Sequence, residues 1–165
     1  MVTRTAKILL LGALALMYTL IVFDNVADFD SNYQFVRHVL MMDSTFPGNH
    51  EMWRALPQPS VHLLFYLGII AWEVTTTVLL WSAVTVLIRR LHSPAATFNS
   101  AKRLPVIALT LSLLMWLLAF LTVGAEWFLM WQSHTWNGQE EAFRMFAVVG
   151  IVLIIFLLPE REEQP

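Results

Sequence analysis

Glu73 is the residue of this sequence whose position most strongly suggests a chemical role. It lies near the middle of the stretch from Val61 to Ile88, which only His62 otherwise interrupts. An acidic side chain at the centre of a bilayer costs at least about 2.5 kcal/mol on insertion scales, so such residues face protein or water and commonly mark functional sites. Two interpretations stay open: Glu73 acts in binding or proton transfer, or it is a neutral group that hydrogen-bonds a neighbouring helix.

Helical spacing places three further polar residues close to Glu73. At 100° per residue, His62, Tyr66 and Thr77 fall within about 60° of Glu73 around a helix. They form a polar stripe that runs inward from one end of this stretch. The stripe predicts one wall of a small polar cavity, with Glu73 at its floor.

A second polar stripe is predicted in the apolar stretch that begins at Leu104. Ser112, Thr122 and Glu126 share a helical face there, and Glu126 is expected near the membrane surface. If the two stripes meet, they enclose the cavity. Arg144 is then the natural cation for Glu126, and a structural ion pair is the favoured interpretation of these two residues. The other residues predicted to border the cavity are Asn25, Asp28, His38 and Trp131.

Histidines and methionines gather in the segments outside the apolar stretches, where they could bind a metal. His38, His50, His62 and His134 lie near several methionines, a mixture of ligands that suits copper. The sequence has no tight ligand motif and no facing pair of mid-membrane histidines for a haem. No metal or cofactor is therefore predicted, with copper or haem on the outer face as the alternative. Nucleophile-elbow, phosphate-loop and metalloprotease motifs are also missing, so no catalytic residue is assigned and an enzyme is not favoured.

The composition requires membrane helices to position these residues. Of the 165 residues, 58% are apolar and 13% are charged, whereas roughly a quarter of a soluble domain is charged. The net charge of −2 argues against a nucleic-acid partner, which needs a basic surface. Four stretches approach the roughly 20 apolar residues that cross a lipid bilayer. We predict an all-α integral membrane four-helix bundle, a single domain over residues 1–165, with spans at about 6–25, 60–88, 104–131 and 141–158.

Basic residues flanking the spans predict the orientation. Arg4 and Lys7 precede the first span, four basic residues lie between 89 and 103, and Arg161 follows the last span. Because positive residues stay on the cytoplasmic side, these features predict a multi-pass protein of the bacterial inner membrane with both termini inside. A cleaved signal peptide is the alternative for the first span. The small residues that cleavage needs are not found after the apolar run, so retention is favoured.

The connection between the first two spans, residues 26–59, is too long for a plain link and is predicted to form a lid. Ser31 and Gln34 have the spacing of a capping box. Apolar residues then recur at helical intervals, which predicts a short amphipathic helix lying over the outer end of the bundle. Pro47-Gly48 predicts a turn, and Pro59 suits the first turn of the second span.

Several motifs on the outer half of the chain resemble a known family. They are Asn25-x-x-Asp28, Phe35-Val36-x-His38-Val39-Leu40, Glu126-Trp127-Phe128 and Trp136-Asn137-Gly138-Gln139. In this pattern the chain resembles, over nearly its whole length, the bacterial family of predicted small integral membrane proteins named domain of unknown function 2165. The resemblance implies a four-helix inner-membrane protein and implies no reaction.

Together these features predict a non-enzymatic accessory or binding module. We expect it to hold a small amphiphile or another membrane protein in an outward-facing polar cavity under the lid. The alternatives are a proton-coupled transport component that uses Glu73 and a membrane enzyme that acts on a lipid-soluble substrate. A homo-oligomer is compatible with each of these hypotheses.

Overall fold

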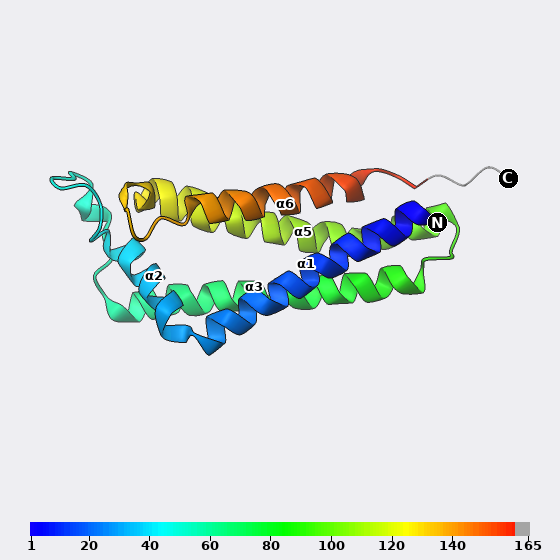
Figure 1. The fold of residues 1–165 in the computed structure, drawn as a ribbon, viewed down its shortest axis with the longest axis horizontal. Coiled ribbons are helices and arrows are strands. Elements are labelled where there is room, and N and C mark those ends of the chain that lie inside the picture. The colour runs from blue at the N-terminus through cyan, green and yellow to red at the C-terminus, as the bar shows by residue number, and fades with distance from the viewer. Residues whose placement is uncertain (161–165) are drawn as a thin grey trace.

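The computed structural model describes residues 1–160 and is built from helices; these residues contain no strand. Figure 1 shows the long helices lying lengthwise beside one another, with α2 crossing one end. The elements are α1 (Val2–Ala27), α2 (Phe29–Met41), η1 (Met52–Arg54), α3 (Pro59–Arg89), α4 (Ala95–Ala101), α5 (Arg103–Leu114), η2 (Met115–Trp127), η3 (Met130–Gln132) and α6 (Gln139–Leu157). The prediction of an all-α protein is confirmed.

The four long helical segments pack in a ring. α1 packs on α3, α3 on α5, α5 and its continuation η2 on α6, and α6 on α1. The main core includes the fully buried Tyr18, Leu80, Phe98 and Leu109. We call the end of the ring that carries residues 26–59 the lid end, and the opposite end, where residues 1 and 160 lie, the terminal end (Figure 1).

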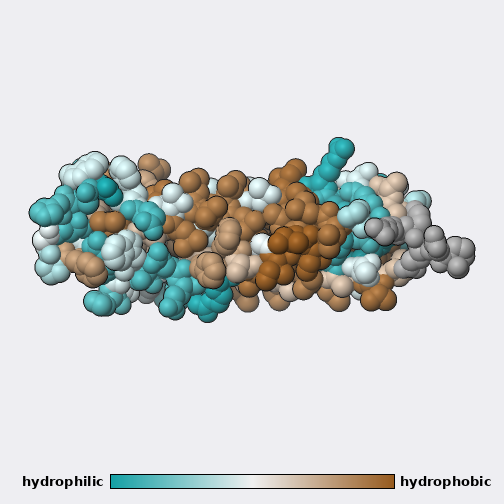
Figure 2. All heavy atoms as spheres, turned by 90° about the horizontal axis from the view of Figure 1, so that it is seen from above, coloured by the Kyte–Doolittle hydropathy of each residue, from teal (hydrophilic) through white to brown (hydrophobic). Residues whose placement is uncertain are grey.

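The outer surface of the ring is apolar along its middle. Figure 2 shows brown, hydrophobic atoms concentrated in the central part of the molecule and teal, hydrophilic atoms gathering toward its ends. Three helical segments are long and apolar enough to cross a membrane: Val2–Ala27, Pro59–Arg89 and Ala95–Trp127. α6 carries three charged residues near its start, Glu140, Glu141 and Arg144. Because of these charges, α6 is not among the segments apolar enough to count as a candidate span. The described residues thus hold three candidate spans, and the predicted fourth lies in α6.

Helix boundaries differ from the predicted ones mainly at the start of α1, which begins at Val2 and not at residue 6, and at the end of the third segment. α3 begins at Pro59, in the first-turn position predicted for it, and ends one residue beyond the prediction. The third helical segment was predicted to end at residue 131 but ends at Trp127, because the backbone turns at Phe128 and Leu129 takes a positive φ of 53°. α6 ends at Leu157, before Pro159, as expected from the restriction that proline places on the preceding residue.

The lid contains the predicted amphipathic helix, but its start was predicted wrongly. α2 begins at Phe29, so Ser31 lies inside the first turn and is not the cap. Gln34 donates instead to the Asp30 carboxylate at 3.3 Å. Val36 and Leu40 are buried, which confirms the predicted apolar face. The turn at Pro47-Gly48 is also confirmed, with Gly48 at φ 78°.

The second half of the third helical segment, η2, is a π-helix, in which hydrogen bonds link residues five apart. The Thr122 hydroxyl follows this register by donating to the Leu117 carbonyl at 2.8 Å. Each residue of a π-helix turns through a smaller angle than in an α-helix, so faces predicted at 100° per residue drift apart along η2. Thr122 and Glu126 are consequently exposed and do not continue the face of the buried Ser112.

Lysines at the terminal end fix the last turn of α6 and the residues that follow it. Lys7 and Lys102 donate to the Leu158 carbonyl, at 3.0 and 2.6 Å. Lys7 also forms a buried ion pair with Glu160. The Asn99 side chain forms two hydrogen bonds with the Glu160 backbone: it accepts from the N–H at 2.9 Å and donates to the carbonyl at 3.0 Å. These contacts hold α6 in line with α1 and α5.

Candidate functional site

The Glu73 carboxyl lies inside the protein, as predicted, and is 2% exposed. Asn25, near the end of α1, donates its side-chain amide to Glu73 Oε2 at 2.6 Å. The Tyr66 hydroxyl, seven residues before Glu73 on the same face of α3, donates to the backbone carbonyl of Asn25 at 2.7 Å. The two bonds position Asn25 between Tyr66 and Glu73, so three of the predicted site residues form one connected group.

This group borders a cavity of about 380 Å³, which we call the polar cavity. α1 slants across the ring and ends before the lid end of α3 (Figure 1), and α2 covers the space that remains. The cavity therefore reaches from Glu73 toward the lid and the start of α6. Its lining consists of Ile21, Asn25, Asn32, Phe35, Val36, Tyr66, Ile69, Glu73, Trp116, Phe120, Asn137, Gly138 and Glu141.

The described residues of the polar lining carry two carboxyl groups and three side-chain amides and include no lysine or arginine. Glu73 is buried at the floor, Glu141 is exposed at the mouth, and three asparagines also line the cavity. Arg144 reaches Glu141 at 3.2 Å, but both side chains are more than 60% exposed, so this pair is screened by water. A cation or a hydrogen-bond donor is thus the chemical group that the cavity complements best, because a buried carboxylate needs such a partner.

Trp116 forms the floor of the cavity beside Glu73, and a buried hydrogen-bond chain fixes its ring. Its indole N–H donates to the Tyr18 hydroxyl at 2.7 Å. That hydroxyl is in turn hydrogen-bonded to the buried Ser112. The chain links α1 to the two halves of the third helical segment immediately below the polar cavity.

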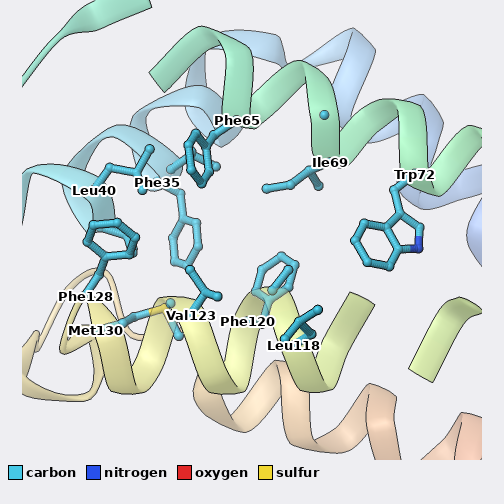
Figure 3. A pocket seen from close by; sticks show the side chains of 15 residues that line it. Phe35, Leu40, Phe65, Ile69, Trp72, Leu118, Phe120, Val123, Phe128 and Met130 are labelled. Carbon is cyan, nitrogen blue, oxygen red and sulfur yellow. The ribbon is translucent and has the colours of Figure 1, made fainter. Parts of the chain in front are cut away.

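A second cavity, which we call the apolar cavity, lies on the other side of a shared wall. It measures about 370 Å³ and is bounded by α2, α3 and η2. Figure 3 shows Phe35 and Leu40 approaching it from α2, Phe65, Ile69 and Trp72 from α3, and Leu118, Phe120 and Val123 from η2. The Trp72 indole N–H is bonded to the Leu111 carbonyl at 3.0 Å, so it offers the cavity no free donor. Four residues line both cavities: Phe35, Val36, Ile69 and Phe120.

Hydrogen bonds hold the lid over these cavities. The Leu56 N–H donates to the Leu40 carbonyl at 2.9 Å, which ties the end of the lid to α2. His62 Nε2 lies 2.5 Å from the Leu56 carbonyl, while His62 Nδ1 is buried with no hydrogen-bond partner among residues 1–160. His62 therefore positions the lid and does not reach Glu73, contrary to the prediction that it lines the cavity.

Aromatic residues join the lid to the connection before α6. Arg54 lies over the rings of Trp53 and Trp127, at 5.3 and 4.9 Å from their centroids. Ser44 bonds Ser133 at 2.8 Å. These contacts close the lid end around the two cavities.

Four of the predicted site residues lie elsewhere. Thr77 is half-buried, and its hydroxyl donates a hydrogen bond to the backbone carbonyl of Glu73 on the same helix at 2.7 Å. Asp28 is exposed where α1 meets α2. His38 pairs with Asp43 at 2.8 Å and stacks on Trp136, with ring centroids 4.5 Å apart. Trp131 packs edge-on against Phe46.

The predicted pair of Glu126 and Arg144 is not formed. Arg144 pairs with Glu141, three residues earlier on α6, and Glu126 is exposed on η2 outside both cavities. The π-helix is the physical cause, because it rotates Glu126 away from the face predicted for it.

Sequence reasoning missed the residues that α2 and the start of α6 contribute. Asn32, Asn137 and Glu141 line the polar cavity, and the apolar cavity was not predicted at all. The motif Trp136-Asn137-Gly138-Gln139 was the one available signal for the α6 side. Among residues 1–160, no three His, Cys, Asp or Glu side chains gather where they could hold a metal ion.

Comparisons with known proteins place the chain in a family. No curated protein matches it significantly, and no solved structure does either. The family model described as "Predicted small integral membrane protein (DUF2165)" matches residues 3–159. That range includes all four long helical segments and both cavities. The chain therefore belongs to the DUF2165 family of small integral membrane proteins.

Proposed function

We propose that this protein is a non-enzymatic binding module of the bacterial inner membrane, which holds a small molecule in the polar cavity. The observation that carries the proposal is a buried carboxyl group, Glu73, that lines a cavity of about 380 Å³ and, within residues 1–160, accepts a hydrogen bond only from Asn25. Cavities of roughly 300–1,000 Å³ with few, convergent polar groups are typical of ligand sites. An ionisable group at membrane depth is by default a functional candidate.

The proposal includes a fourth membrane span, α6, and a four-helix bundle. α6 has 19 residues and is about 28 Å long at 1.5 Å per residue, close to the roughly 30 Å of hydrocarbon. It runs along α1, α5 and η2 from the lid end to the terminal end, where Lys7 donates a hydrogen bond to the Leu158 carbonyl. Its charged residues lie in or next to the first turn, where a membrane surface accommodates them.

The lid end faces away from the cytoplasm in this proposal. Arg4, Lys7, Lys102 and Arg103 lie at the terminal end, and the positive-inside rule places that end in the cytoplasm. Arg161, which was assigned to the same side, lies outside the described residues. The polar cavity then opens toward the outer leaflet and the periplasm.

A proton-coupled transport role for Glu73 is less well supported. Transport needs a second path from Glu73 to the cytoplasmic side. Toward that side α3 contributes Leu80, Ala83 and Leu87 to the main core, and all three are fully buried. An outward-opening binding site requires no such path.

Native mass spectrometry of the protein released from its own membrane in a mild non-ionic detergent tests the proposal. We expect the wild-type protein to retain a small molecule and Glu73→Gln to lose it while remaining folded. Glu126→Gln is the matched control, because Glu126 is exposed outside both cavities, and it should retain the molecule. If neither wild type nor control carries any bound molecule, or if Glu73→Gln retains it fully, the proposal is wrong.

A further inference from the structure

The two cavities are neighbours that share a wall but differ sharply in chemistry. The polar cavity has carboxyl groups at its floor and mouth, while the apolar cavity is lined almost wholly by carbon. Phe35, Val36, Ile69 and Phe120 separate them and contribute to both linings. A molecule that extends across this wall would meet acceptors on one side and only apolar side chains on the other.

Charge limits what the polar part of such a molecule can be. Glu73 and Glu141 are the acidic residues of the polar lining, and the described lining has no lysine or arginine to hold an anion. A phosphate or carboxylate head would lie against carboxyl groups in a poorly solvated space, which is strongly unfavourable. An amine is the head group that these acceptors complement.

The apolar part is limited by volume and by access. The apolar cavity lies between α3 and η2 and is bordered by Phe65 and Leu118, which are 41% and 48% exposed on the surface assigned to lipid. A chain can therefore enter sideways from the bilayer. The volume of about 370 Å³ lies at the low end of ligand sites, which suits one alkyl chain better than two.

We propose that the two cavities form one site for a single-chain amphiphile with an amine head, whose head lies beside Glu73 and whose chain occupies the apolar cavity. The inference rests on the binding function proposed above and adds the class of ligand. It also assigns a role to α2, which supplies Phe35 and Val36 to the shared wall and couples the lid to the ligand.

Glycines of the membrane helices provide a matched test. Gly68 lines the apolar cavity, and a Cβ atom built on it meets no atom within 4 Å, so Gly68→Leu fills the cavity without a backbone clash. Gly12 of α1 is equally free of neighbours and lines neither cavity, which makes Gly12→Leu the control. Binding of dodecylamine, dodecanol and dodecanoate to each variant is measured by titration in native mass spectrometry at fixed detergent concentration.

We expect dodecylamine to bind wild type at least tenfold more tightly than dodecanoate does. Gly68→Leu should weaken dodecylamine binding at least tenfold, Gly12→Leu should leave it unchanged, and Glu73→Gln should abolish the preference for the amine over dodecanol. If dodecanoate binds as tightly as dodecylamine, the head assignment is wrong. If Gly68→Leu binds dodecylamine like wild type, the chain assignment is wrong, while loss of the native ligand from Glu73→Gln would still uphold the proposed function.

Photolabelling of the wild-type protein supplies a readout that does not depend on the folding of a variant. A dodecylamine analogue with a diazirine at the end of its chain is irradiated in the complex, and the labelled peptides are mapped. Labels on residues 65–72 and 118–124 support the proposal. Labels confined to α1 or α6 would overturn it.

Discussion

Removal of the Tyr18 hydroxyl group should destabilise the protein and loosen the floor of the polar cavity. Tyr18 is fully buried, accepts a hydrogen bond from the Trp116 indole and is bonded to Ser112. In Tyr18→Phe the packing of the ring is kept, but the buried Trp116 N–H loses its partner. The loss of this partner costs Ser112 less, because a helical serine can donate its hydroxyl to the backbone carbonyl four residues earlier.

The expected magnitude follows from this difference. A buried donor left without a partner costs about 1–3 kcal/mol, and hydrogen bonds between membrane helices reach about 1.7 kcal/mol. We expect Tyr18→Phe to lower the free energy of unfolding by about 1–2 kcal/mol. Ser112→Ala should lower it less, because the bond between Trp116 and Tyr18 survives. The double variant should cost less than the sum of the single ones, since all three groups form one chain.

The free energy of unfolding is measured in bicelles by steric trapping. Tyr33→Phe is the control: Tyr33 packs by its ring against Phe29 and Tyr66, and within residues 1–160 its hydroxyl makes no hydrogen bond. A free energy of unfolding for Tyr18→Phe within about 0.3 kcal/mol of the wild-type value would be a smaller change than an ordinary intramolecular hydrogen bond contributes. That result would mean that the buried hydrogen-bond chain does not fix the cavity floor.

Three further predictions concern the terminal end and the linings of the two cavities. Burial alone would raise the pKa of the Glu160 carboxyl, but the hydrogen bond and charge of Lys7 hold that pKa below its ordinary value. The stability that Glu160 contributes is therefore present above about pH 4.3 and is lost as the pH falls further; unfolding curves should show this loss for wild type and not for Glu160→Gln. A Cβ added at Gly138 would lie 2.9 Å from the tip of the Phe35 ring, which borders open cavity space, so Gly138→Ala should displace the wall of both cavities and cost about 1 kcal/mol in unfolding measurements, the low end of the overpacking range. Gly68→Ala, which meets no neighbour, should instead stabilise α3 by about 0.5–1 kcal/mol, and a loss of stability would refute the space assigned to the apolar cavity.

The elements that could be predicted from the sequence are those set by composition and by terminating residues. The apolar length of α3, with Pro59 at its start, fixed its bounds to within one residue at each end. The mid-membrane position of Glu73 predicted correctly that its side chain faces protein, because lipid offers a carboxyl group no partner. Tyr66 followed from α-helical spacing on the same helix.

The rest depended on geometry that local patterns do not contain. The π-helical register of η2 is set by tertiary packing, and it moved Glu126 out of the face that α-helical spacing predicted. Asn32 and Glu141 reach the polar cavity from α2 and α6, whose placement depends on contacts between segments more than 80 residues apart, such as the bond between Ser44 and Ser133. The apolar cavity is bounded by three elements at once, so no single stretch of sequence indicates it.

Cysteine accessibility at residue 21 tests most directly whether Glu73 borders a cavity that opens to the outside within the membrane. The sequence has no cysteine, so one introduced thiol reports alone. Ile21 lines the polar cavity, while its neighbour Leu20 is 54% exposed on the surface assigned to lipid. In spheroplasts, Ile21→Cys should react rapidly with the membrane-impermeant trimethylammonium-ethyl methanethiosulfonate. It should react more slowly with the anionic sulfonatoethyl reagent, and Glu73→Gln should reduce that difference. An Ile21→Cys thiol that reacts no faster than Leu20→Cys, or that reacts equally with both reagents, would contradict the account.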